Sequence, residues 1–167
     1  MDTSKIAVMA IGNLLQSDEG AGIHVLNEME KHWRFSPPIH LIDGGTMGND
    51  LLPYLEENER IILLDAVNFN ENPGFIGTIE NEDILRRINT KLSIHHLGLS
   101  DVLSAAQLLD IEPEEIYLIG IQPENIEMST ELTNTVRQRV PKMIEIAIAK
   151  LEEWGVQAER VQNGEPS

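Results

Sequence analysis

The chain has 167 residues, 41% of them hydrophobic, which suffices for the core of one domain, but no stretch approaches the roughly 20 apolar residues of a membrane span. It carries 28 acidic and 12 basic side chains, and its formal net charge of −16 would repel a nucleic acid or an anionic membrane. The absence of cysteine excludes disulfides, thiolate metal sites and a cysteine nucleophile, and with no signal-peptide pattern at the N-terminus it favours a cytoplasmic location.

Apolar runs alternate with segments of helical spacing along most of the chain. The predicted strands are, in order, Lys5–Ile11, Ile39–Ile42, Arg60–Val67, Phe75–Glu80 and Ile116–Ile121. The predicted helices are Gly20–Trp33, Asn49–Glu57, a helical turn at Asp83–Ile88, Leu99–Leu109 and Thr133–Trp154. This alternation predicts a three-layer α/β/α fold in which helices cover both faces of a twisted, mostly parallel five-stranded sheet. The strand Phe75–Glu80 is the candidate for an edge, where it could run antiparallel.

The C-terminal part divides into a long helix and a polar end. Pro141 interrupts the apolar stripe of the helix Thr133–Trp154 and should kink it or mark an early turn, and Gly155 ends it. The residues that follow are polar. We therefore predict one α/β domain over residues 1–155 and a loose polar tail over residues 156–167.

The signature motifs of several enzyme classes are missing. The chain has no G-x-S-x-G elbow of an α/β serine hydrolase, no P-loop and no H-E-x-x-H zinc helix. Gly12 and Gly20 are eight positions apart, which is too long for the tight turn that holds a dinucleotide pyrophosphate. The missing phosphate loop therefore argues against a nucleotide-binding, flavodoxin-like protein.

Three side chains that can bind a metal lie where an apolar run gives way to a turn. Glu19 follows the first strand, Asp65 ends the run Ile61–Leu64, and His95 opens a Gly-containing segment. An open α/β sheet keeps its ligand site at the carboxyl ends of its strands. Two carboxylates and an imidazole together suit a borderline divalent metal.

Glu19 could also be structural and either histidine could be a surface residue, whereas the position of Asp65 favours function. Glu19 could interact with the dipole of a helix beginning there, and Asp18 is well placed as its N-cap. A buried Asp65 would require a partner. His95 and His96 are neighbours and point to opposite sides in extended backbone, so at most one of them faces a site.

The segment Asp43-Gly44-Gly45-Thr46 is a fourth candidate. It is either a simple turn or a place where backbone approaches a ligand and Asp43 acts as a base, and the motif alone favours neither. His24, His32 and His40 have no comparable context, and we interpret them as structural.

Taken together, these segments resemble the nickel-iron hydrogenase maturation endopeptidases. The similar segments lie in the family's order and at its spacing, and they extend from about Lys5 to Trp154. They are Gly12-Asn13-Leu14-Leu15 with Asp18-Glu19-Gly20, Asp43-Gly44-Gly45-Thr46, Asp65-Ala66, His95-His96-Leu97-Gly98-Leu99-Ser100-Asp101-Val102-Leu103, and Gly120-Ile121-Gln122-Pro123.

The resemblance implies an endopeptidase, classed in the family with aspartic-type peptidases. Such an enzyme removes the C-terminal extension of the hydrogenase large subunit in one cut after nickel has entered that subunit. The family's metal-binding residues correspond to Glu19, Asp65 and His95, where the position in the motif selects His95 over His96. Asp43 is the candidate catalytic or supporting carboxylate.

The same resemblance implies a metal that arrives with the substrate. The three ligands would form an open site that binds metal weakly by itself, which nickel carried by the large-subunit precursor would occupy and which other divalent metals could also occupy. The implied partner is that precursor, with no nucleic acid and no membrane. The alternative on the same fold is a non-catalytic, nickel-sensing maturation chaperone that would hold the precursor without shortening it.

Overall fold

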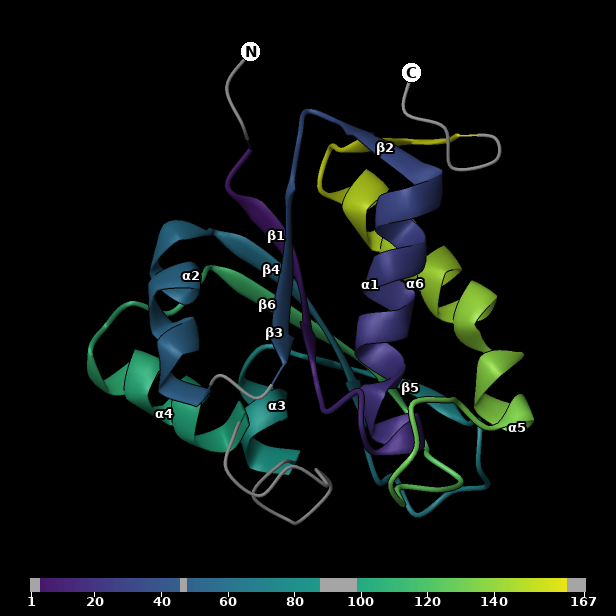
Figure 1. Ribbon diagram of the computed structural model, residues 1–167. Helices are drawn as coiled ribbons and strands as arrows, with labels where there is room; N and C mark the ends of the chain where they lie inside the picture. Colours follow the sequence, from purple (N-terminus) through teal and green to yellow (C-terminus); the bar gives the residue numbers. More distant parts are fainter. Residues whose placement is uncertain (1–3, 46–47, 88–98, 162–167) are drawn as a thin grey trace.

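A central five-stranded sheet lies between two layers of helices in the computed structural model, which describes residues 4–45, 48–87 and 99–161 (Figure 1). The strand order is β3-β1-β4-β6-β5. The first four of these strands pair in parallel, and β5 runs antiparallel to β6 at the edge. The strands are β1 (Ile6–Ile11), β3 (His40–Gly45), β4 (Arg60–Ala66), β5 (Ile76–Glu80) and β6 (Glu115–Ile121).

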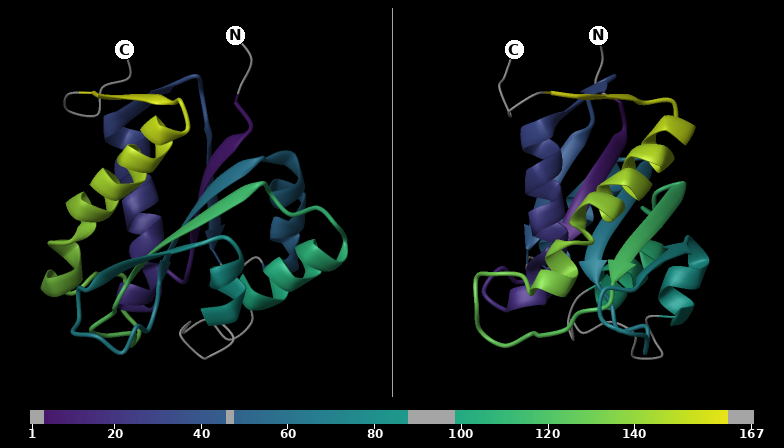
Figure 2. Two further views of the ribbon diagram at one scale, coloured as in Figure 1. Left: turned by 180° about the vertical axis from the view of Figure 1, so that it is seen from behind. Right: turned by 90° about the vertical axis from the view of Figure 1, so that its right-hand side faces the viewer.

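The helices divide between the two faces of the sheet, as the left view of Figure 2 shows. One face is covered by α1 (Ala21–His32), α5 (Asn134–Arg137) and α6 (Val140–Glu153). The other face is covered by α2 (Leu52–Glu57), α3 (Glu82–Arg87) and α4 (Leu99–Leu108). Two short 3-10 turns, η1 (Ser17–Gly20) and η2 (Gly48–Leu51), precede α1 and α2. The predicted α/β/α architecture is confirmed.

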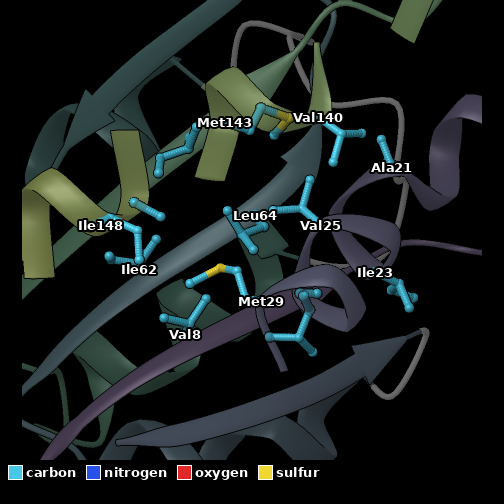
Figure 3. Packing of buried hydrophobic residues seen from close by; sticks show 14 of the residues in the cluster. Val8, Ala21, Ile23, Val25, Met29, Ile62, Leu64, Val140, Met143 and Ile148 are labelled. Carbon is cyan, nitrogen blue, oxygen red and sulfur yellow. The ribbon is translucent and has the colours of Figure 1, made fainter. Parts of the chain in front are cut away.

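The continuous apolar runs of the central strands supply both faces of the core. In β4, Ile62 and Leu64 pack on the α1 and α6 side, whereas Ile61 and Leu63 pack on the α2 and α4 side. Figure 3 shows Ile62 and Leu64 beside Met29 of α1 on the first of these sides. A strand buried on both faces needs this uninterrupted apolar pattern, which is why the runs were visible in the sequence.

The strand order places a topological switch point at β1. The chain leaves β1 through α1 to form β3 on one side, then returns through α2 to form β4 on the other side of β1. The connections after β1 and β3 therefore lie on opposite faces, and open α/β sheets bind their ligands at such a point, beyond the carboxyl ends of the strands, here β1 and β4. Glu19 follows β1, and Asp65 is the penultimate residue of β4, so the topology brings both to this point.

Strand β3 and the C-terminal helix differ in detail from the predicted elements. The strand continues through Asp43, Gly44 and Gly45 instead of turning, because these residues extend the pairing of β3 with β1. The long C-terminal helix is divided into α5 and α6, and Pro141 lies in the first turn of α6, where a missing N–H costs nothing; this confirms the early turn. No helix in the described ranges is long and apolar enough to cross a membrane.

The prediction of a loose tail from residue 156 is wrong for its first residues. Val156 is 1% exposed, and β7 (Gln157–Arg160) pairs antiparallel with β2 (Trp33–Ser36) in a second, two-stranded sheet. Both strands have four residues, and β7 has almost no apolar content, so neither gives a clear pattern in the sequence. The segment after α6 is thereby tied to the strand that follows α1.

Candidate active site

Glu19 lies in η1 and is 8% exposed. Gly12, at the end of β1, has φ of +134°, and a Cβ at this position would overlap the carbonyl oxygen of Glu19. Only glycine permits this close approach. The amide of Gln16 faces the Glu19 carboxylate, and in the orientation that satisfies both groups its Nε2 donates to Oε1 at 3.2 Å and to Oε2 at 2.9 Å. The turn after β1 thus holds Glu19 in a defined place.

Asp65 is completely buried at the end of β4. Its Oδ1 accepts a hydrogen bond from the backbone N–H of Ala66 at 2.8 Å. Gly22, in the first turn of α1, lies against this strand end, because a Cβ there would overlap the carbonyl oxygen of Leu64. Helix α1 and the preceding η1 therefore contact the backbone beside Asp65, which brings the segments of Glu19 and Asp65 together.

The third predicted ligand, His95, falls in residues 88–98, outside the described residues, as does His96. Among the residues that are described, no three His, Asp or Glu side chains gather in a way that could hold a metal ion. The trio of Glu19, Asp65 and His95 remains a prediction, of which two members are placed at one edge of the sheet.

Asp43 is an exposed residue of β3, which lies on the opposite side of β1 from β4. It pairs in register with Ala10, which faces α1. Because side chains alternate along a strand, Asp43 shares that face, whereas Asp65 follows Leu64 and takes the opposite face. Asp43 and Asp65 therefore flank the same strand from different sides of the sheet, and a catalytic role for Asp43 stays a prediction.

Asp18 has a role that the sequence did not reveal. The N-cap interpretation is wrong, because Gly20 is the N-cap residue of α1 and no side chain caps this helix. Asp18 is instead fully buried, and its carboxylate accepts hydrogen bonds from the backbone N–H groups of Glu124 at 2.9 Å, Asn125 at 3.0 Å and Thr133 at 2.9 Å. It fixes the connection after β6 to the turn that carries Glu19.

Gln122, directly after β6, fixes the connection after β4 in the same way, through side-chain hydrogen bonds. This residue is 9% exposed, and its Oε1 accepts from the N–H of Phe69 at 2.6 Å while its Nε2 donates to Oδ1 of Asn68 at 3.2 Å. The signal in the sequence was a polar residue directly after the buried run of β6. Together, the buried polar side chains of Asp18 and Gln122 order the loops at the carboxyl ends of the parallel strands, which we call the carboxyl edge of the sheet.

A separate cavity of about 440 Å³ lies between α1 and the α5–α6 segment, and none of the predicted site residues lines it. Its walls include His24, Trp33, Leu132, Arg137 and Ile144. Nε2 of His24 is buried there without a hydrogen-bond partner among the described residues. Burial, together with the nearby Arg137, lowers the pKa of His24 below its ordinary value of 6.5, against the weaker opposing effects of Glu28 and Asp18. His24 lies apart from the predicted site residues, and its structural interpretation stays a prediction.

The lowered pKa of His24 predicts a pH dependence of stability. The unfolded chain takes up a proton at His24 near pH 6.5, whereas the folded chain resists it, so the free energy of unfolding should fall as the pH drops below 6.5. Urea unfolding at pH 7.5 and pH 5.0 should show a larger loss for the wild type than for His24→Gln. Equal losses in the two proteins would show that His24 protonates as easily in the folded state as in the unfolded chain.

Comparison with known proteins gives one consistent result. The family model described as hydrogenase maturation protease (HycI) matches residues 23–150. The hydrogenase expression/formation protein HupD of Bradyrhizobium diazoefficiens is 36% identical over 159 residues, which cover 94% of this chain and 83% of that protein.

Solved structures agree with the sequence matches. The hydrogenase maturating endopeptidase HybD of Escherichia coli has a TM-score of 0.87 and 33% identity, covering 93% of this chain and 96% of that one. The [NiFe] hydrogenase maturation protease HybD of Thermococcus kodakarensis has a TM-score of 0.72 and 28% identity, covering 87% and 97%. Since the family model spans well over half of the chain and these relatives span nearly all of it, the chain is a hydrolytic enzyme that belongs to the hydrogenase maturation protease family.

Proposed function

We propose that this endopeptidase removes the C-terminal extension of a nickel-loaded precursor of a nickel-iron hydrogenase large subunit. Family membership supports peptide hydrolysis in hydrogenase maturation. The observation that supports the finer proposal is the placement of Glu19 after β1 and of Asp65 near the end of β4, both buried, on neighbouring strands at the topological switch point of the sheet. Ligand sites of open α/β sheets lie at such a point.

Nickel on the substrate would be recognised by Glu19, Asp65 and, in the proposal, His95. Carboxylate oxygens and an imidazole nitrogen are suitable donors for a borderline divalent ion, and three protein ligands leave positions open for groups of the substrate. A buried carboxylate gains most from a nearby cation, because little water competes for it. The ion, once docked, could also polarise the peptide carbonyl at the cleavage point.

Two further elements belong to the same proposal. Asp43, exposed on β3, is the candidate supporting carboxylate. The proposed location is the cytoplasm, in keeping with a chain that contains no cysteine for disulfides. The proposed partner is the large-subunit precursor.

The direct test compares nickel-loaded and nickel-free precursor. Incubation of each form with the purified protein, followed by intact-mass measurement, should show loss of the C-terminal extension from the loaded form alone, because the ion completes the recognition site. Equal cleavage of both forms would contradict nickel recognition. A stable complex with the loaded precursor and no loss of mass would instead identify a non-catalytic, nickel-sensing chaperone.

A further inference from the structure

Exposed apolar side chains gather on two loops beside Glu19. Leu14 and Leu15, on the loop after β1, are 37% and 58% exposed, and Ile126 and Met128, on the loop after β6, are 43% and 88% exposed. They are four of the seven large apolar residues exposed within the described ranges. We call residues 13–17 and 124–131 the rim. Apolar side chains concentrated on one surface of a water-soluble fold mark an interaction site.

The two loops of the rim are joined along their backbones. The N–H of Ser17 donates to the carbonyl of Ser129 at 2.8 Å, and the N–H of Ser129 donates to the carbonyl of Leu15 at 2.9 Å. Asp18 N–H donates to the carbonyl of Asn125 at 3.0 Å, next to the buried Asp18 carboxylate contacts. The apolar side chains are therefore presented from a fixed backbone, so little ordering entropy opposes binding there.

The rim is continuous with the candidate site. Leu14 packs on Gly20, since a Cβ at Gly20 would lie 2.9 Å from Cα and 3.3 Å from Cδ2 of Leu14. Gly20 directly follows Glu19 in η1. A partner seated on the apolar side chains would therefore lie next to the turn that carries Glu19.

The charge of the rim indicates the chemistry of that partner. It contains no lysine and no arginine, whereas Glu124, Glu127 and Glu131 are all exposed. An acidic segment would be repelled, and a segment with apolar side chains flanked by lysine or arginine would be complementary in both respects.

We propose that the rim is the docking surface for an apolar, basic segment of the large-subunit precursor. This inference rests on the proposed function and adds a second recognition element to it. Nickel reports whether the precursor is ready, and the rim selects which protein is held against Glu19 and Asp65.

The test measures binding and cleavage separately. Immobilised nickel-loaded precursor is titrated with wild type, with the double variant Leu15→Ser and Met128→Ser, and with Leu108→Ser. Leu108 is a control because it is 87% exposed but lies away from the rim. It is the last residue of α4, which precedes β6, whereas residues 124–131 of the rim follow β6. Truncating two apolar anchors should raise the Kd at least about ten-fold, and Leu108→Ser should stay within about two-fold of wild type.

A second pair of variants tests the charge. Glu127→Lys should weaken binding and flatten its dependence on salt, because it removes one attractive charge from the rim. Glu30→Lys makes the same change of charge near the far end of α1 and should leave both quantities close to the wild-type values. At saturating precursor, the two controls Leu108→Ser and Glu30→Lys should retain the wild-type kcat.

Each outcome decides at least one of the two proposals. If wild type cuts the precursor and the double variant binds as tightly as wild type, the rim is not the docking surface and the proposed function stands. If wild type binds without cutting, the proposed function fails, and the Kd values still judge the rim. No binding by wild type overturns both. A wild-type dimer, seen by light scattering and lost in the double variant, would identify a second copy of the chain as the occupant instead.

Discussion

Asp65→Asn and Glu19→Gln should each abolish measurable cleavage of the nickel-loaded precursor while the protein stays folded. Both substitutions keep the size of the side chain and remove the negative charge that would hold the ion. In metal sites, loss of a residue that only hydrogen-bonds to a ligand already costs roughly 10- to 100-fold in metal affinity or activity, so loss of a direct ligand should cost more. Intact-mass measurement of the precursor over a time course gives the rate.

The control for this prediction is a neutralised carboxylate away from the edge. Asp83→Asn removes a charge that is exposed and pairs with Arg86 on α3, and it should leave the cleavage rate unchanged. Circular dichroism and urea unfolding establish that all three variants are folded. Cleavage by Asp65→Asn within a few-fold of wild type would show that this carboxylate does not hold the ion.

Asp18→Ala should destabilise the protein by about 3–5 kcal/mol, a large share of the roughly 5–15 kcal/mol that keeps a domain folded. The substitution removes the acceptor for the backbone N–H groups of Glu124, Asn125 and Thr133, each of which would lose its partner. Urea unfolding should also show a smaller loss for Asp18→Asn, which keeps one acceptor oxygen.

The matched control is Asp83→Ala on the surface of α3, which should change the free energy of unfolding by no more than about 0.5 kcal/mol. A loss below about 1 kcal/mol in Asp18→Ala would mean that water or another group replaces the carboxylate. In that case Asp18 would not be what holds the loop after β6.

The fold was predictable where a residue's own neighbours determine its structure. The apolar runs of β1 and β4 are buried on both faces, so they are visible without any knowledge of their partners. The strands β2 and β7 pair with each other across more than a hundred residues of chain and pack on the core through Trp33, Phe35 and Ala158, and their four-residue patterns do not report this pairing. Local sequence therefore fails where pairing between distant segments decides the structure.

The same distinction separates Asp18 from Glu19. The two carboxylates are adjacent and look alike in the sequence, yet Asp18 is committed to backbone donors more than a hundred residues away, at Glu124 and Thr133. No local pattern reports such partners. Asp65 could be identified because it ends an apolar strand, whereas His95 was selected over His96 by its position in a family motif.

The contacts of Asp18 also constrain when the carboxyl edge can form during folding. The long-range partners of the turn after β1 lie in residues 124–133, which follow all five strands of the main sheet in the chain. Contacts between residues so distant in sequence form late, because much chain entropy is lost before they are made. A nascent chain that ends before residue 124 therefore lacks these contacts, and the turn that carries Glu19 can be fixed only after all five strands have been synthesised.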